Sequence, residues 1–420
     1  MIRRIYVDNY KCLVNFELPL QEVTLLLGPN GVGKTAVLEV ASALQQLLRG
    51  TAKVASNEAF PLASRTRWHT RPLQTFELEV ELESDPLRYR LEVEHGRMAG
   101  QARILLERLE AAGKPLFEFR QGEVHLFRDD HSPGPVFHAD WSESALARVP
   151  PRRDNRRLSR FLAFARGLTV CSLYPPGFRI ESSSEDAHLH RDGSNFASWY
   201  RWMLQERPDC DSALQGALAE VVEGFAGMRQ TQIGLDTRAL IVALDHGGFP
   251  YELWFHELSD GQRASIVLYA LLHFAKAKER PVGISAPPPR DMAPPTTATT
   301  PPWQAATTTT TATTSTTMPP PEEFAPRPAG VSCVFLDEPD NYLALAEIQP
   351  WLMELMDVYG DGFQAVLCSH HPELIDYLGP ERGCMLQREQ SGVTVVRRVS
   401  EMGCAEGFKL SEVVARGWER

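Results

Sequence analysis

Residues 28–35 read GPNGVGKT, which matches the pattern G-x-x-x-x-G-K-[ST]. The match follows the apolar run VTLLL at 23–27 and precedes residues 34–48, where apolar side chains recur with helical spacing. A glycine-rich loop between a buried strand and a helix is the context that identifies a phosphate-binding P-loop. The stretch therefore predicts a nucleotide-binding α/β fold, and a chance glycine-rich turn is the weaker interpretation.

The residue types of this loop suit a nucleotide that is bound together with Mg²⁺. The glycines at 28, 31 and 33 allow backbone N–H groups to curl around phosphates. We expect Lys34 to reach the β- and γ-phosphates and the hydroxyl of Thr35 to ligate Mg²⁺. The expected cofactors are therefore ATP and Mg²⁺, and the expected phosphate-binding residues are Asn30, Gly31, Val32, Gly33, Lys34 and Thr35.

Two carboxylates end a second apolar strand. Residues 334–338 read VFLDE and are followed by Pro339. Adjacent charges are unusual at the end of a buried strand, and a P-loop in the same chain gives them a purpose. Asp337 would hold Mg²⁺, and Glu338 would polarise the attacking water as a general base. Solvated acids in a capped loop are the alternative.

A histidine pair follows a third apolar strand, in the sequence LCSHHP at 367–372. Ligands of α/β sheets gather at the carboxyl ends of the strands. We expect His370 to sense the γ-phosphate and orient the water, and we prefer it to His371 by position. Without the other motifs, a loop histidine with an ordinary structural role would be the better interpretation.

The polar sequence LSDGQ at 258–262 stands at the start of a helix-like run. Ser and Asp can cap a helix by accepting hydrogen bonds from its first turn. The free N–H groups and the dipole of a helix start can also bind a phosphate. Both interpretations stay open for Ser259, which could serve as cap and as ligand.

The order P-loop, LSDGQ, strand-DE and strand-SHH resembles the heads of ABC-type ATPases, whose signature is close to LSGGQ. In that family, the signature helix of one subunit points at the γ-phosphate that the other subunit holds. The resemblance implies a homodimer with ATP at its interface and two composite sites. It also implies that Ser259, Gly261 and Gln262 contact the nucleotide of the partner.

The beginning of the chain, IRRIYVDNYKCLVNFELPL, is similar to the opening of RecF, SMC and OLD-like ATPases, in which a basic residue near Lys11 lies close to the nucleotide. The segment after the second carboxylate motif also resembles these bacterial stand-alone ATPases, which are often labelled AAA-family. Two departures stand out. Asp260 replaces the usual second glycine of the signature, and Gln74 is a weak candidate for the Q-loop glutamine, with a structural role favoured.

Composition excludes some classes of function. The chain has 420 residues, 43% hydrophobic and 23% charged, with a net charge of -11. Such an acidic chain is not a generic nucleic-acid coat, although a local basic patch can bind DNA. The seven cysteines show no metal-like spacing, and no run approaches the ~18 apolar residues of a membrane helix. We expect a cytoplasmic protein with reduced thiols and no membrane insertion.

We expect an α/β fold of the P-loop ABC type, with a mixed central sheet, an antiparallel β meander and a helical lobe. Its parts are an ATPase lobe at 1–150, a helical lobe with the signature helix at 151–284, a Thr/Pro-rich disordered insertion at 285–329 and a C-terminal ATPase lobe at 330–420. Alternation predicts the meander at 75–127 and strands within 238–254. Helical spacing predicts helices at 156–166, 195–227 and 262–278.

The expected activity is ATP hydrolysis by a dimer that acts as an ATP-driven switch in DNA repair or anti-phage defence. The alternative is a sensor ATPase that controls a partner effector, a nuclease or toxin, without binding DNA itself. A transporter subunit or a binding module without turnover are weaker alternatives. The basic run at 151–161, PRRDNRRLSRF, could contact DNA phosphates, but a solvated helix start or a protein-binding surface is favoured.

Overall fold

The computed structural model describes residues 1–54, 59–83, 85–98, 101–276, 332–358, 363–402 and 408–417. The insertion predicted at 285–329 lies outside the described residues. The described residues before 277 and after 331 belong to one structural unit. Within this part of the chain, no helix has both the length and the apolar character of a membrane span.

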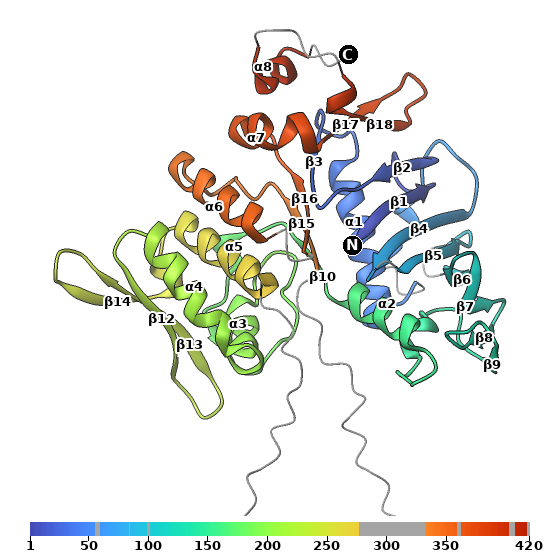
Figure 1. Ribbon diagram of the computed structural model, residues 1–420, viewed down its shortest axis with the longest axis horizontal. Helices are drawn as coiled ribbons and strands as arrows, with labels where there is room; N and C mark the ends of the chain where they lie inside the picture. The colour runs from blue at the N-terminus through green and yellow to red at the C-terminus, as the bar shows by residue number, and fades with distance from the viewer. Residues whose placement is uncertain are drawn as a thin grey trace, which may run out of the picture. The chain divides into compact units, whose positions relative to one another are not determined.

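An eight-stranded antiparallel sheet forms the N-terminal part of the fold (Figure 1). Side-chain alternation builds it: in β5 every second residue from Leu87 is buried, whereas Arg88 and Arg90 face outward. Arg90 pairs with Glu77 on the neighbouring strand at 2.8 Å. The sheet confirms the meander predicted at 75–127. In spatial order its strands are β2 Phe16–Pro19, β1 Ile2–Asp8, β4 Leu73–Leu82, β5 Asp85–Glu94, β6 Arg103–Ala111, β7 Lys114–Arg120, β8 Glu123–Phe127 and β9 Pro133–His138.

A six-stranded mixed sheet carries the sequence motifs. Its first five strands are parallel, and the last is antiparallel to its neighbour. In spatial order they are β10 Leu168–Cys171, β15 Cys333–Asp337, β16 Gln364–Cys368, β3 Val23–Leu27, β17 Gly383–Arg388 and β18 Thr394–Arg398. The carboxyl ends of parallel strands share one edge. The P-loop, Asp337 and Ser369 therefore meet there, as they follow or end β3, β15 and β16.

A buried glutamine and a helix join the two sheets. The Gln364 side chain accepts a hydrogen bond from the Ile2 N–H group at 2.8 Å and donates to the carbonyls of Ile2 and Gln21, each at 2.8 Å. Helix α1, Lys34–Arg49, contributes Leu44 and Leu47 to the same apolar core as both sheets. The first turn of α1 is thus held rigidly beside the edge that carries the motifs.

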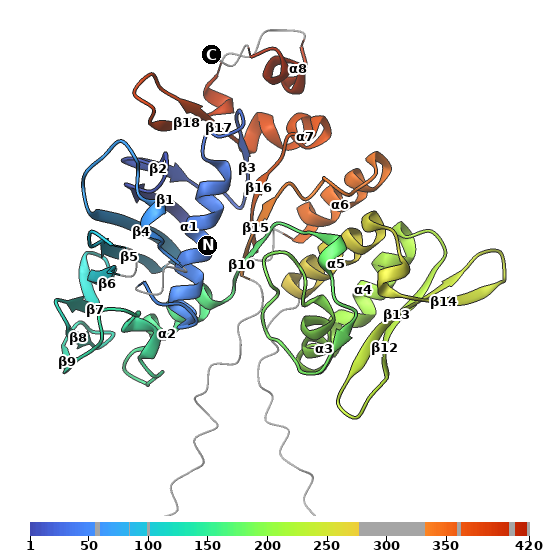
Figure 2. The same ribbon diagram turned by 180° about the vertical axis from the view of Figure 1, so that it is seen from behind.

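The third part of the fold combines helices with a small sheet (Figure 2). Strand β13 lies at its centre and pairs with β11, β12 and β14. The strands predicted within 238–254 are confirmed, and so are the helix predicted at 156–166 and the helix predicted from 262, which begins at Asp260. The remaining elements are α2 Arg156–Arg166, α3 Phe196–Glu206, α4 Pro208–Val221, α5 Asp260–Lys276, α6 Leu345–Val358, α7 Pro372–Arg382, α8 Leu410–Ala415, β11 Glu181–Ser182, β12 Phe225–Gln232, β13 Arg238–Asp245 and β14 Pro250–Trp254.

The prediction of helical structure at 195–227 was wrong toward its C-terminal end. Two helices occupy the region, separated before Pro208, and β12 begins at Phe225. Gly224 lies in the turn between α4 and β12. Its φ of 72° is left-handed, and a Cβ there would lie 2.9 Å from the Asp245 carbonyl oxygen. The close approach of β13 therefore forces a turn that helical spacing could not reveal.

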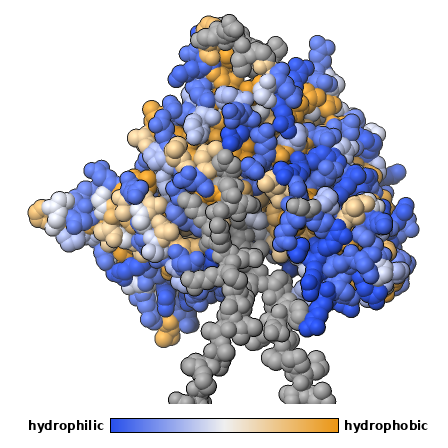
Figure 3. All heavy atoms as spheres, in the orientation of Figure 1, coloured by the Kyte–Doolittle hydropathy of each residue, from blue (hydrophilic) through white to orange (hydrophobic). Residues whose placement is uncertain are grey.

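The surface divides between polar and apolar parts. Hydrophilic side chains cover most of the face over the eight-stranded sheet, whereas apolar colour reaches the tips of the small sheet (Figure 3). Leu235 and Phe249, in the turns that follow β12 and β13, are 96% and 78% exposed. With its mixed central sheet, antiparallel meander and helices, the molecule confirms the predicted fold class.

Candidate nucleotide-binding site

The loop between β3 and α1 has a backbone that only glycine allows at two positions. Gly28 has a φ of 138°, and a Cβ there would collide with the Leu386 carbonyl oxygen. Gly33 has a φ of 118°, and its Cβ would lie 2.8 Å from the Cys12 sulfur. Both values lie in the region that L side chains rarely adopt. The loop can thus curl over the start of α1.

The first turn of α1 is open to a ligand. Gly33 occupies the N-cap position, and no side-chain hydrogen bond caps the helix. The buried Lys34 folds back and donates to the carbonyls of Gly28 at 2.7 Å and Pro29 at 3.3 Å. Burial lowers the pKa of Lys34, and the carboxylates of Glu338 and Asp337 oppose this shift. Uncapped N–H groups beside a buried cation make an anion site.

Asp337 and Glu338 lie at the end of β15, beside this loop. Burial raises the pKa of Asp337, while the charge of Arg191 and a hydrogen bond from Thr35 oppose the rise. The Glu338 carboxylate accepts a hydrogen bond from the Asn341 amide at 2.7 Å. Its φ of 48° is left-handed, which is uncommon outside glycine and typical of functional positions.

A cavity of about 390 Å³ and one of about 550 Å³ meet at Lys11, Glu39 and Ala63. Seven of the predicted residues line the larger cavity together: Asn30, Gly31, Gly33, Lys34, Thr35, Asp337 and Glu338. Lys11, an eighth predicted residue, also lines it. The walls also include three arginines and a tryptophan that the sequence did not single out, namely Arg65, Arg67, Arg388 and Trp68.

Local sequence could have indicated part of this second group. Residues 65–68 read RTRW, a mixture of cations and an aromatic that suits a nucleotide base and phosphates, and Trp68 is 46% exposed. Arg388 ends β17, more than 300 residues from this segment along the chain, and no spacing pointed to it. Only the order of the strands in the mixed sheet places Arg388 beside the P-loop.

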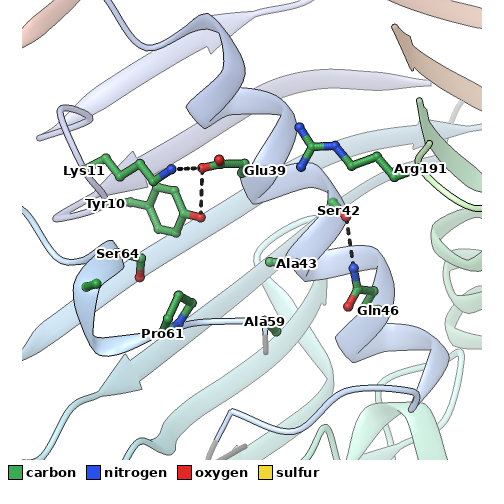
Figure 4. Close-up of a pocket in the computed structure, with 11 residues that line it drawn as sticks. Tyr10, Lys11, Glu39, Ser42, Ala43, Gln46, Ala59, Pro61, Ser64 and Arg191 are labelled. Atoms are coloured by element: carbon green, nitrogen blue, oxygen red, sulfur yellow. Dashed lines mark hydrogen bonds and ion pairs between the residues drawn. The ribbon is translucent and has the colours of Figure 1, made fainter. Parts of the chain in front are cut away.

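The smaller cavity lies against α1 (Figure 4). Figure 4 shows the Lys11 ammonium and the Tyr10 hydroxyl directed at the Glu39 carboxylate, with Arg191 on the other side. Lys11 forms an ion pair with Glu39, and the Tyr10 hydroxyl donates to the same carboxylate at 3.5 Å. Lys11 therefore faces both cavities while its charge is partly satisfied.

The two histidines after β16 differ. His371 caps α7, because its Nδ1 accepts a hydrogen bond from the Glu373 N–H group at 3.2 Å. His370 is exposed and does not line the larger cavity. Partial desolvation and then the charge of Lys34 lower the pKa of His370, and Glu338 opposes them. His370 therefore lies within electrostatic range of the P-loop lysine, and its role stays a prediction.

The signature sequence stands at the N-terminus of α5, outside the walls of both cavities. Ser259 and Gln262 bond reciprocally: the Gln262 N–H donates to the Ser259 hydroxyl at 3.2 Å, and the Ser259 N–H donates to the Gln262 side chain at 3.1 Å. Asp260 forms an ion pair with Arg263. A Cβ on Gly261 would lie 2.7 Å from the Tyr342 carbonyl oxygen. The interpretation of Ser259 as a cap is confirmed, and its role toward a phosphate stays a prediction.

Three other predicted features have structural partners. The Val32 side chain is buried, and its carbonyl accepts a hydrogen bond from Thr394 at 2.6 Å. Gln74 is buried and donates to the Asn9 carbonyl at 2.9 Å, which agrees with a structural role. In the basic run, Arg152 pairs with Asp154 at 3.2 Å, Arg157 with Asp85, and Arg160 with Glu83 at 3.0 Å.

Two comparisons of the sequence found similar proteins. The family described as "AAA domain, putative AbiEii toxin, Type IV TA system" matches residues 23–376. The OLD nuclease of Thermus scotoductus (strain ATCC 700910 / SA-01) is 47% identical over 38 residues, which are 9% of this chain and only 7% of that protein.

Solved structures similar to this chain include heads of SMC proteins. An SMC head bound to the C-terminal winged-helix domain of ScpA has 9% identity and a TM-score of 0.49, and the match covers 94% of this chain and 97% of that one. The SMC head domain from Thermotoga maritima has 11% identity and a TM-score of 0.46, with 95% and 98% covered.

Proposed function

The chain belongs to this family of AAA domains, since the match spans residues 23–376 of 420, and on that premise we propose that it is an ATP-hydrolysing, dimeric switch. The motif order places it in the RecF, SMC and OLD-like group of ABC-type ATPases. The single observation that carries the proposal is the larger cavity, where an uncapped helix start, a buried lysine and two carboxylates converge.

The residues in this cavity fit ATP with Mg²⁺. The Thr35 hydroxyl and the Asp337 carboxylate are oxygen ligands of the kind Mg²⁺ prefers. No cluster of three or more His, Cys, Asp or Glu side chains in the described ranges could hold a metal alone. That suits Mg²⁺, whose remaining ligands are phosphate oxygens and water. When bound, Mg-ATP supplies the transferable phosphoryl group and neutralises its charge.

Each side chain then has a separate task. Lys34 exchanges its loop carbonyls for β- and γ-phosphate oxygens and stabilises their charge. Glu338, held by Asn341, orients a water molecule in line with the γ-phosphate and accepts its proton. His370, which does not line the cavity, senses the γ-phosphate from the end of β16, and Trp68 offers a flat apolar face to the base. Lys11 lies where it can exchange Glu39 for a phosphate.

The proposed dimer follows from the position of the signature. Ser259 is exposed, and neither it nor Gly261 nor Gln262 lines the cavity that holds the P-loop. We therefore propose that these residues meet the γ-phosphate of a second copy, which gives two composite sites related by two-fold symmetry. ATP would close the dimer, and hydrolysis would open it.

For the biological process, we propose DNA repair or anti-phage defence in the cytoplasm. One observation favours the alternative, control of a partner nuclease or toxin without DNA. The arginines at 152, 157 and 160, which could have met DNA phosphates, are paired with carboxylates. Cations that are already neutralised release fewer counterions on binding DNA and add little affinity.

Steady-state ATP hydrolysis, measured alone and with duplex or single-stranded DNA, tests activity and process together. We expect Glu338→Gln to lower turnover about 10²- to 10⁴-fold while nucleotide binding persists. DNA stimulation that Glu338→Gln removes would support repair or defence on DNA. Turnover that ignores DNA would favour a protein partner. Absence of ATP binding in calorimetry would refute the proposal.

Mixing two inactive variants tests the composite sites. Lys34→Ala removes the P-loop cation, and Ser259→Arg blocks the signature. Random mixing should restore about a quarter of the wild-type turnover, because half of the dimers are mixed and each has one intact site. Light scattering with ATP would show the dimer. A mixture as inactive as its components would argue against sites shared between copies.

A further inference from the structure

Arg191 approaches the carboxylate that is expected to bind the metal. Its Nη2 lies 4.0 Å from Oδ2 of Asp337, in an ion pair whose side chains are 37% and 14% exposed. Arg191 belongs to the loop between β11 and α3, and no sequence motif pointed to it. It also lines the smaller cavity, where Figure 4 shows its guanidinium directed toward α1.

Backbone hydrogen bonds fix the position of Arg191 beside the mixed sheet. The Ser172 N–H donates to the Arg191 carbonyl at 2.7 Å, and the Tyr174 N–H donates to the Asp192 carbonyl at 2.9 Å. Residue 172 directly follows β10, which is parallel to β15 with Cys171 opposite Leu336. The backbone of the loop is therefore anchored next to the strand end that carries Asp337.

The other end of this loop leads to the signature. Asn195 ties the loop together, since it accepts from the His190 N–H at 2.7 Å and donates to Asp186 at 2.7 Å. The next residue, Phe196, stacks on Phe255 with ring centroids 5.4 Å apart. Phe255 is fully buried and lies four positions before Ser259. A packed route thus joins Arg191 to the start of α5.

We propose that Arg191 is a positioning residue that couples occupancy of the P-loop site to the position of the signature segment 255–262. The inference rests on the proposed function, because Mg²⁺ and Arg191 would compete for the same carboxylate. Without nucleotide, Arg191 balances the charge of Asp337. With Mg-ATP, Asp337 turns to the metal, and the loop is released to shift Phe196, Phe255 and the helix start behind them.

If Arg191 and Asp337 formed only an ordinary surface ion pair, a different result would be expected. Exposed pairs contribute about 0–1 kcal/mol and transmit nothing when they are removed. Coupling requires a bistable element that both sites bias. The two interpretations therefore differ in one expected effect of Arg191→Ala. Only the coupling predicts that this variant alters the response of the signature segment to nucleotide binding.

The test compares Arg191→Ala, Arg191→Lys and the control Arg179→Ala, which alters an exposed arginine of the same region. A fluorescent ATP analogue is titrated at increasing Mg²⁺, and hydrogen exchange is followed in residues 255–265. Without the competing guanidinium, Arg191→Ala should lower the half-saturating Mg²⁺ about three- to fivefold. It should also abolish the change in exchange that Mg-ATP causes in the wild type and in Arg179→Ala.

Arg191→Lys keeps a cation and should restore part of both effects. Wild-type Mg²⁺ dependence and wild-type exchange in Arg191→Ala would overturn the coupling while leaving nucleotide binding in place. A wild type that binds no nucleotide would instead overturn the proposed function, and the inference with it. Equal melting temperatures of the variants would show that the effects do not come from loss of folding.

Discussion

The two glycine-containing helix starts of this protein, those of α1 and α5, solve the same problem in opposite ways. Both leave N–H groups in the first turn without partners inside the helix. At α1, Gly33 offers no side-chain cap, and Lys34 is the nearest cation. At α5, Ser259 and Gln262 cap each other and Asp260 pairs with Arg263.

The difference shows that a polar, glycine-containing helix start is not by itself an anion site. No side chain caps the start of α1, whereas the N–H groups of Ser259 and Gln262 at the start of α5 bond to side chains of the same segment. In the function that we propose, the start of α1 binds the nucleotide of its own chain, and the start of α5 acts on a phosphate that a partner brings to it.

The largest effect is expected at the start of α1, which has no side-chain cap. Lys34→Ala removes a buried cation that would contact two phosphates, and nucleotide affinity should fall at least about 100-fold, or about 2.7 kcal/mol. Isothermal titration with ATP measures it. Lys114→Ala changes an exposed lysine on β7 and should bind as the wild type does. Equal affinity of the two variants would show that α1 is not the nucleotide site.

A change at the cap position of α1 sharpens the comparison. Gly33→Ala forces a Cβ into a left-handed backbone and against the Cys12 sulfur, so the free energy of unfolding should fall by about 1–3 kcal/mol. Gly216→Ala, within α4 and with open space around it, should instead raise it by about 0.5–1 kcal/mol. Urea denaturation measures both. The same sign for both variants would contradict the argument from backbone geometry.

At the start of α5, Ser259→Ala removes the hydroxyl oxygen that accepts a hydrogen bond from the Gln262 N–H. The loss of this cap should lower the free energy of unfolding by about 1 kcal/mol. Nucleotide affinity of the single chain should not change, because Ser259 lies outside the cavity. Ser183→Ala, at an exposed position, serves as the control for both measurements. If Ser259→Ala lowered the ATP affinity of the monomeric chain, the starts of α1 and α5 would have to bind the same nucleotide within one chain.

A small effect on stability is expected at the carboxylate beside the start of α1. Burial raises the pKa of Asp337 above its usual value near 3.8, so its ionised form destabilises the folded state at neutral pH. Asp337→Asn should raise the free energy of unfolding at pH 7 by about 1 kcal/mol. This gain should shrink as the pH falls through the raised pKa toward 4, while Mg²⁺-dependent nucleotide binding is lost. A lower free energy of unfolding for Asp337→Asn than for the wild type at pH 7 would contradict this prediction.

Local signals in the sequence carried much of the fold. The P-loop, the acidic end of β15 and the meander were predictable, because sterics, side-chain alternation and helical spacing act between neighbours in the chain. The break at Gly224 was not, since it depends on the carbonyl of Asp245, which β13 brings close. The predicted lobe boundaries and the insertion at 285–329 stay predictions.

The sequence by itself predicted which residues would carry phosphate chemistry: Lys34, Thr35, Asp337 and Glu338 stand in motifs whose meaning is local. Only the tertiary structure decided which other charges act there. Arg152, Arg157 and Arg160, close together in the chain, are paired with acids, whereas Arg191 and Arg388, far apart in the chain, lie at the site. The physical reason is that a side chain's electrostatic partners are set by strand order and register, which bring distant segments together.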